Sequence, residues 1–208
     1  MTAEEYSAAN IEVLELDESV RKRPGMYFGF GLGDPRLPTQ ILTVVVCHAF
    51  HPANAVGPDH RPRVVAEVTG ALTFTVTDDH AETLPDSGEP TLGYRDSLLT
   101  VTRWSSAAAA ALTTRTVVEI WRDGRGLRQE LAGAQPLSPP VPFVPPGGSG
   151  TRVAFALDPA LLAPGAAVTA DLAALDVHGH YCEAEPGTGP VVIRDLRDPA
   201  APITHRLP

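Results

Sequence analysis

Two pairs of short segments with period-two hydrophobicity constrain the fold of this chain most strongly. Val64 to Thr69 and Leu72 to Thr77 alternate apolar and polar side chains across a two-residue break. Val117 to Trp121 and Leu127 to Leu131 flank Asp123-Gly124, a dipeptide that favours a tight turn between antiparallel strands. Alternation of this kind gives each strand one apolar face. The sequence therefore predicts two β-hairpins in a sheet.

Helical patterns surround these hairpins. The segment from Leu37 to Phe50 is apolar over most of its surface, which is typical of a buried helix. This order of elements predicts an α/β two-layer sandwich, with helices packed on one face of a mixed, mostly antiparallel sheet. The other predicted elements are helices at Glu12 to Arg21, Ser105 to Leu112 and Val168 to Leu175, and strands at Thr151 to Leu157 and Val191 to Arg194.

The length of 208 residues suits one good-sized core, so we expect residues 1–208 to form a single domain. Within it, residues 1–30 are expected to form an N-terminal arm and a first helix, which Pro24-Gly25 ends. Residues 133–150 are rich in proline and glycine and are expected to form a long irregular connection inside the domain.

The charge and composition exclude several classes of function. The formal net charge is −9 and Arg21-Lys22-Arg23 is a short basic run, so we expect no direct nucleic-acid binding. The N-terminus lacks the pattern of a signal peptide, and we expect no membrane association because no apolar stretch approaches the roughly 20 residues that span a bilayer. Cys47 and Cys182 are the only cysteines, which fits a cytoplasmic protein.

The opening of the chain carries a specific motif. Val20-Arg21-Lys22-Arg23-Pro24-Gly25-Met26-Tyr27-Phe28-Gly29, preceded by Tyr6 and Ile11, resembles the start of the ATPase domain of the DNA gyrase B subunit and its topoisomerase IV relative, in the GHKL superfamily. Segments resembling later family motifs follow in the same order, so the resemblance spans almost the whole chain and implies the GHKL fold. These segments are Val44 to Ala53, Phe74 to Asp79, Ala111 to Arg125, Gly150 to Phe155 and Ile193 to Asp198.

The resemblance also implies where ATP chemistry would reside. In the family a helix Glu polarises the attacking water and an Asn one turn later holds Mg²⁺; here Val44 and His48 stand at those positions. A valine cannot accept a proton, and a neutral imidazole is a poor ligand for Mg²⁺. Leu99 to Ser105 stands where the family has its Gly-rich phosphate loop. We therefore expect neither ATP hydrolysis nor a bound cofactor, and the 208 residues leave no room for the rest of a topoisomerase.

Two polar positions of the family's pocket persist. Asp78 matches the Asp that hydrogen-bonds adenine, and Thr151 matches the Thr that assists it. One interpretation is that Asp78 is simply a strand-end turn residue, which is common. The other is that the pocket still accepts a ligand whose donor group points at Asp78. Trp104 has two interpretations as well: it belongs to the core, or it lines an apolar cavity.

Three of the seven histidines, His48, His51 and His80, match positions around the nucleotide. They either fill space left by an absent ligand or form a remodelled polar pocket, in which a histidine and Asp78 would run acid–base chemistry. A transition-metal site at the helix histidines is a third interpretation, as is one at His178-Gly-His180-Tyr-Cys182, although a solvated turn explains the latter segment; we expect no metal. The candidate catalytic residues are thus His48, His51, Asp78 and His80. The candidate ligand-binding residues are Val44, His48, His51, Val76, Asp78, Asp79, Arg103, Trp104, Arg122 and Thr151.

The leading hypothesis is a non-hydrolytic gyrase-B-like protein that binds a small organic ligand in its remodelled pocket, or a protein partner on its surface. The alternative is a repurposed cofactor-independent enzyme of a bacterial biosynthetic pathway, catalysing cyclisation, isomerisation or dehydration. A further alternative is a decoy that pairs with a gyrase subunit. The resemblance of the arm around Tyr6 and Ile11 to the segment exchanged between gyrase B protomers also implies a homodimer.

Overall fold

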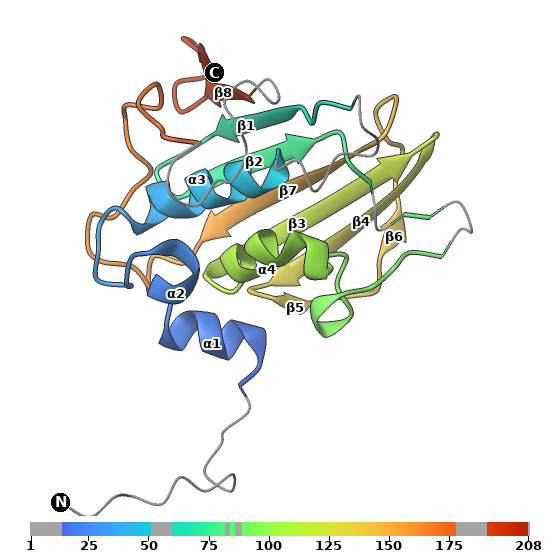
Figure 1. Cartoon of the computed structure of the whole chain (residues 1–208), viewed down its shortest axis with the longest axis horizontal. Coiled ribbons are helices and arrows are strands. Elements are labelled where there is room, and N and C mark those ends of the chain that lie inside the picture. Colours follow the sequence, from blue (N-terminus) through green and yellow to red (C-terminus); the bar gives the residue numbers. More distant parts are fainter. Residues whose placement is uncertain (1–13, 51–59, 82–83, 86–88, 178–190, 208) are drawn as a thin grey trace, which may run out of the picture.

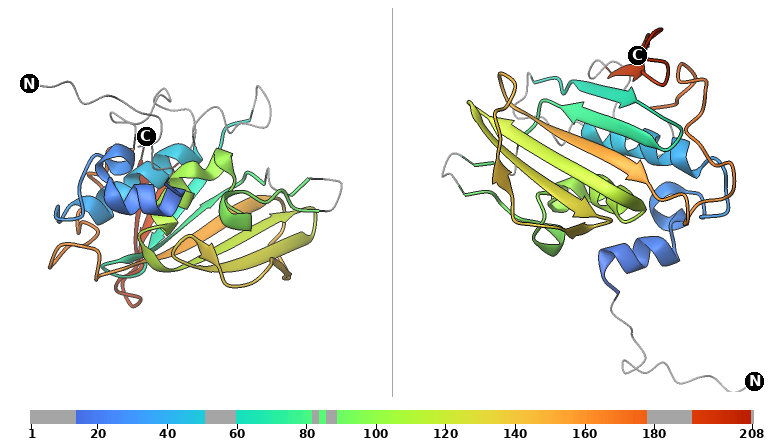
Figure 2. Two further views of the ribbon diagram at one scale, coloured as in Figure 1. Left: turned by 90° about the horizontal axis from the view of Figure 1, so that it is seen from below. Right: turned by 180° about the vertical axis from the view of Figure 1, so that it is seen from behind.

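A computed structural model describes residues 14–50, 60–81, 84–85, 89–177 and 191–207 of the chain. These residues form two layers, a large twisted sheet and a set of helices that cover one of its faces (Figures 1 and 2). The predicted fold class, an α/β sandwich with a mixed, mostly antiparallel sheet, is confirmed. In the described residues no helix is both long and apolar enough to cross a membrane.

The sheet has nine strands in the part of the chain that the structure describes, in the order β5-β4-β3-β7-β2-β1-β8-β9, with β6 also paired to β4. All pairings are antiparallel except that of β1 with β8. The strands are β1 Val64–Val68, β2 Thr73–Asp78, β3 Thr113–Arg122, β4 Arg125–Ala132, β5 Gln135–Pro136, β6 Val141–Pro142, β7 Gly150–Leu157, β8 Val191–Asp195 and β9 Ile203–Leu207.

Both predicted hairpins are present. In the first, β1 pairs with β2 so that Val64 faces Asp78 and Val68 faces Phe74. In the second, β3 pairs with β4 across the Asp123-Gly124 turn, in which both residues have positive φ (51° and 79°). Strand β7 lies between the hairpins and joins them into one sheet, because it pairs with β2 on one side and β3 on the other.

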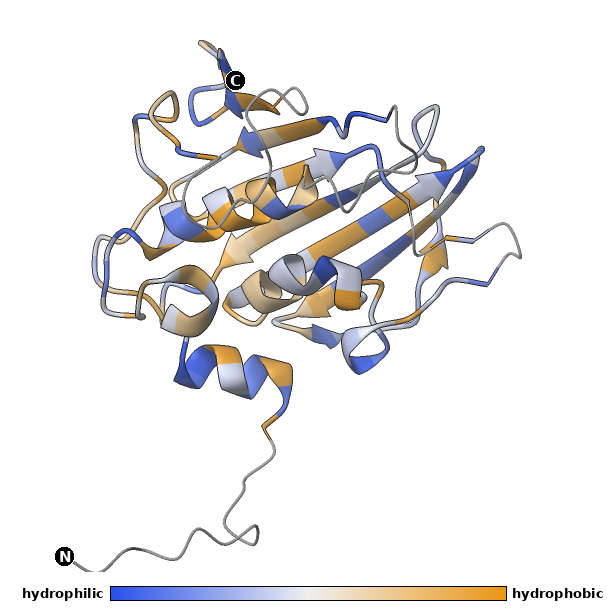
Figure 3. Ribbon diagram, viewed as in Figure 1, coloured by the Kyte–Doolittle hydropathy of each residue, from blue (hydrophilic) through white to orange (hydrophobic). Residues whose placement is uncertain are grey.

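The helical layer packs on the buried residues of these strands. Helix α3 is the longest at 13 residues, and nine of these are buried, as its apolar composition predicts. Hydrophobic residues run along α3, and they alternate with polar residues along β3 (Figure 3). The helices are α1 Leu16–Lys22, α2 Gly25–Phe28, α3 Leu37–Ala49 and α4 Trp104–Ala110, with two short 3-10 turns, η3 Tyr94–Asp96 and η4 Val101–Arg103.

The segment Val168 to Leu175, predicted to be a helix, is not helical. Val168 and Leu172 are buried as the pattern requires. The backbone groups of this segment, however, form hydrogen bonds with other parts of the chain. The Val168 N–H donates to the Ala71 carbonyl at 2.8 Å, and the Arg197 guanidinium donates to the carbonyls of Val168 and Thr169 at 3.2 and 2.9 Å. The helix prediction was wrong because an arginine distant in sequence takes carbonyls that a helix would bond internally.

Short-range patterns also missed parts of the sheet. The connection at 133–150 was predicted to be irregular, but it contains β5 and β6, which both pair with the outer edge of β4. Strand β9, which pairs with β8, was not predicted. These strands are short or largely exposed, so they lack the half-buried alternation on which strand prediction depends.

The face of the sheet opposite the helices contains a charged cluster. Glu119 on β3 is only 4% exposed and lies between arginines of both neighbouring strands. Its carboxylate contacts Arg128 Nη1 at 2.9 Å and Arg152 Nη2 at 2.7 Å. Two residues further along, the indole of Trp121 covers Gly150 of β7. This part of the face is therefore closely packed although no helix covers it.

Gly150 is a test of that packing. A Cβ there would lie 2.5 Å from the Asp78 carbonyl oxygen and 2.7 Å from Trp121 Cζ2. We expect Gly150→Ala to lower the free energy of unfolding by about 2–3 kcal/mol, because backbone and a buried ring would have to move. Gly147→Ala is the matched control, since nothing lies within 4 Å of its added Cβ. Denaturant unfolding checks both variants, and equal stabilities would contradict this account.

Candidate functional site

A buried ion pair lies where the resemblance places the base of a nucleotide. Asp78 is the last residue of β2 and is 5% exposed, while Arg103 of η4 is 6% exposed. Arg103 Nη2 donates to Asp78 Oδ1 at 2.9 Å, and Nη1 donates to Oδ2. Both carboxylate oxygens are thus engaged by one guanidinium, in the bidentate geometry that makes such pairs strong.

The backbone of His80 completes this cluster. Its N–H donates to Asp78 Oδ1 at 3.0 Å. Its carbonyl oxygen accepts hydrogen bonds from Arg103 Nη2 at 3.0 Å and from Thr151 Oγ1 at 2.6 Å. The four residues form one closed network, which we call the Asp78 cluster. The two polar residues that the sequence marks as retained, Asp78 and Thr151, therefore bond within the protein.

The fold positions each member of the Asp78 cluster. Asp78 and Thr151 are directly opposite in the antiparallel β2–β7 pair, so both lie at one end of the central strands. Arg103 is the last residue of η4 and directly precedes α4. Because a buried guanidinium needs a compensating anion, Asp78 satisfies a requirement that Arg103 creates.

A second contact joins the two helices beside the cluster. The imidazole of His48 on α3 meets the indole of Trp104, the first residue of α4, edge-to-face with 5.3 Å between ring centroids. Trp104 is 37% exposed, and Val44, one turn before His48, is 4% exposed. Trp104 therefore lies at the surface against His48, while Val44 belongs to the apolar core.

Asp79 lies between Asp78 and His80 in the sequence, but its side chain contacts a different segment. It accepts hydrogen bonds from the Arg63 backbone N–H and Nε, both at 3.1 Å, and its Oδ2 lies 3.3 Å from His60 Nε2. Burial by itself raises the pKa of the Asp79 carboxyl, but these bonds from Arg63 and His60 outweigh it, so the pKa is lowered from 3.8. Asp79 therefore fastens the segment before β1 to the end of β2.

The remaining candidate residues lie as follows. Val76 is buried in β2, and Arg122 is the last residue of β3, directly opposite Arg125. His51 lies outside the described residues, as do the arm around Tyr6 and the His178 to Cys182 segment. Within the described chain, no group of three or more His, Cys, Asp or Glu side chains is placed to hold a metal ion.

The pairing of Arg103 with Asp78 could not be foreseen from the sequence. Both residues are candidates there, but separately, and their contact joins positions 25 residues apart. No local signal marks Arg103 as buried, because the two residues directly before it, Val101 and Thr102, are exposed. Sequence reasoning also missed a cavity between α1 and η3.

The sheet order, the helices on one face and an aspartate that ends the strand beside β7 define an α/β sandwich of the GHKL ATPase type. The chain is similar to the B subunit of DNA topoisomerase 4 from Caulobacter vibrioides, with 31% identity over 182 residues. The match covers 77% of this chain and 25% of that protein, so the chain spans a quarter of the relative's length. No family profile matches the chain. The chain is a distant homologue of this topoisomerase protein and belongs to the GHKL ATPase family.

The Asp78–Arg103 pair predicts an asymmetric response to substitution. We expect Arg103→Met to lower the free energy of unfolding by about 3–5 kcal/mol, because it leaves the Asp78 charge buried and unpaired. The double variant Asp78→Asn with Arg103→Met should recover most of that loss, since neither buried charge remains. Urea unfolding of the wild type, both single variants and the double variant gives the coupling energy. Additive losses in this cycle would show that the pair is not coupled.

Asp79 predicts a pH-dependent contribution to stability. Because the folded pKa of Asp79 lies below 3.8, its bonds stabilise the fold above that pH and are lost as the pH falls through the folded value. We expect Asp79→Asn to cost about 0.5–1 kcal/mol at pH 7 and progressively less below pH 3.8. Thermal melts across this range check it, with the exposed Asp176→Asn as control. A deficit that stays constant down to acid pH would contradict the assignment.

Proposed function

We propose that this chain is a non-hydrolytic GHKL-fold binding protein, which acts without ATP through the surface beside His48 and Trp104. The observation that carries the proposal is the bidentate contact of Arg103 with Asp78. In the family that the chain resembles, this carboxylate would receive the adenine amino group. Here a guanidinium of the same chain takes both oxygens, so adenine would have to displace a buried ion pair to reach them.

The residues around the cluster also fit Mg-ATP poorly. Val44 lies in the apolar core at the position of the family's water-activating Glu and has no group that accepts a proton. His48, at the position of the Mg²⁺-binding Asn, packs its imidazole against Trp104. Hard Mg²⁺ prefers oxygen ligands. The metal ligand and the proton acceptor are therefore replaced by groups with different chemistry, and Arg103 engages the base contact, Asp78.

The binding surface that we favour is the α3–α4 boundary. Trp104, which contacts the half-buried His48, is 37% exposed, and Val101, three residues before Trp104, is 71% exposed, so two large apolar side chains reach solvent here. An aromatic side chain with a polar neighbour is common both in small-molecule sites and at protein interfaces. A small organic ligand or a protein partner would contact Trp104 first.

ATP binding is the decisive test. We expect no change in melting temperature with ATP, ADP or adenosine at millimolar concentration, with or without Mg²⁺, and no phosphate release. The single variant Arg103→Met is the comparison for adenosine, because it vacates the position of the guanidinium and keeps the Asp78 carboxylate. A Mg²⁺-dependent stabilisation of the wild type by ATP would refute the proposal.

Pairing with a topoisomerase subunit is the second candidate function. The similarity to a topoisomerase IV protein favours it, since a homologous surface can compete for the same partner. Size-exclusion chromatography of the purified chain with the topoisomerase IV ATPase protein would give a mixed complex if this function is correct. The repurposed enzyme receives less support, because Arg103 occupies both oxygens of Asp78 and leaves neither to act as a base with His48.

A further inference from the structure

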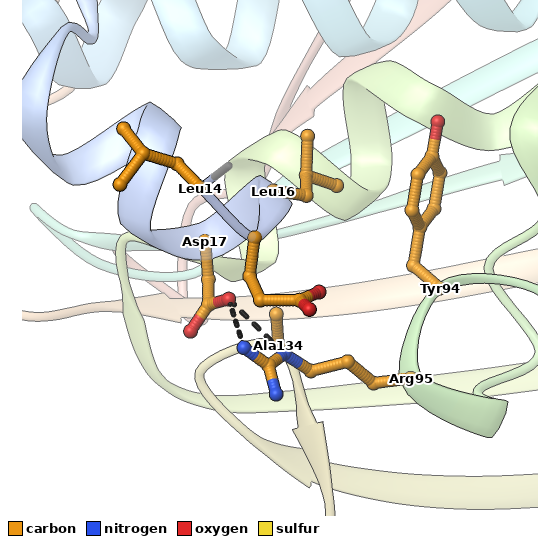
Figure 4. Close-up of a pocket in the computed structure, with 7 residues that line it drawn as sticks. Leu14, Leu16, Asp17, Tyr94, Arg95 and Ala134 are labelled. Atoms are coloured by element: carbon orange, nitrogen blue, oxygen red, sulfur yellow. Dashed lines mark hydrogen bonds and ion pairs between the residues drawn. The ribbon is translucent and has the colours of Figure 1, made fainter. Parts of the chain in front are cut away.

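A cavity of about 250 Å³ lies between the start of α1 and the 3-10 turn η3 (Figure 4). It shares no residue with the Asp78 cluster, and nothing in the sequence marked it. Apolar and charged side chains both line it, and Figure 4 shows Leu14 and Leu16 on one side and the Asp17–Arg95 pair on the other. The lining residues are Leu14, Glu15, Leu16, Asp17, Tyr94, Arg95 and Ala134.

The 3-10 turn η3, which forms one wall of the cavity, is fixed by contacts with residues 98–99 and through them with β4. A Cβ on Gly93 would lie 2.2 Å from the Leu99 carbonyl oxygen, so the backbone passes itself closely there. The Tyr94 N–H donates to that carbonyl at 2.9 Å, and the buried Gln129 of β4 accepts the Leu98 N–H at 2.8 Å. Arg95 has φ of 53°, a left-handed conformation that is uncommon for arginine. Tyr94 and Arg95 are therefore presented from a fixed turn.

The charges at the mouth do not balance. Arg95 Nε and Nη2 both donate to Asp17 Oδ1, at 3.0 and 2.7 Å. These bonds leave Asp17 Oδ2 for another donor. The lining also includes Glu15, so two carboxylates and one guanidinium lie at the cavity. The bond to Asp17 and the charges of Glu15 and Glu18 raise the pKa of Arg95. The cavity thus combines apolar walls with a net negative mouth, which favours a cation that carries an apolar body.

We propose that this cavity binds a small organic ammonium ligand. The ligand's aromatic or aliphatic body contacts Leu14, Leu16 and Tyr94, and its ammonium group lies between Glu15 and Asp17 Oδ2. The inference is independent of the proposed function, because the cavity and the Asp78 cluster have no residue in common. A result that disproves one of the two proposals therefore leaves the other unaffected.

The experiment is an NMR titration of the full chain with phenethylamine as probe. Phenethyl alcohol and 3-phenylpropionate are the matched neutral and anionic probes. We expect the amine to shift the amides of Leu14, Leu16, Tyr94 and Ala134, and to bind at least about fivefold more tightly than the alcohol, with no binding of the anion. Equal affinity for amine and alcohol, or shifts that map elsewhere, would overturn the proposal.

Two variants that change the charge of the cavity in opposite directions provide a second test of amine binding. Glu15→Gln should weaken amine binding about threefold, and Arg95→Gln should strengthen it about threefold, since one removes a negative and the other a positive charge at the mouth. Asp176→Asn, an exposed acid outside the cavity, should leave binding unchanged. If both cavity variants keep the wild-type spectrum but do not alter affinity, the proposal fails. It also fails if sedimentation shows that a second copy of the chain covers the cavity and excludes the amine.

Discussion

The buried ion pair between Asp78 and Arg103 is the constraint on which the site depends. A charged group removed from water is tolerated only with a partner of opposite charge and further hydrogen bonds. The protein meets both conditions by joining the end of β2, His80 two residues further on, and the last residue of η4. Thr151 adds the central strand β7 to the same network. The need to pair these two buried charges thus holds the start of α4 against the ends of β2 and β7.

This ion pair gives Asp78 a structural role. The resemblance aligns Asp78 with the aspartate that contacts adenine in the gyrase family, and the sequence alone left open whether it serves a ligand or a turn. In the structure it serves neither purpose alone, because its oxygens satisfy Arg103 and the His80 backbone. Asp78 therefore contributes to the fold, because its carboxylate joins the end of β2 to Arg103 and to the His80 backbone.

The parts of the fold that were predictable are those set by local pattern. The two hairpins follow from alternation and from Asp123-Gly124, and α3 follows from its apolar surface. The parts that were not predictable depend on side chains from distant positions. Arg197 diverts the carbonyls of Val168 and Thr169 from a helix, and Arg103 reaches Asp78 across 25 residues. Short-range periodicity carries no information about such long-range donors.

The proline-rich strap formed by β5 and β6 has a consequence for assembly. Strand β4 would otherwise end the sheet with a row of open backbone groups, which is a template for pairing with another chain. The strap covers that edge, and Pro136 and Pro142 lack the amide hydrogen that a further strand would need. Growth of the sheet by strand addition is therefore blocked on this side. Any polymerisation through backbone pairing would have to begin at the opposite border, where β9 is the outermost strand of the described sheet.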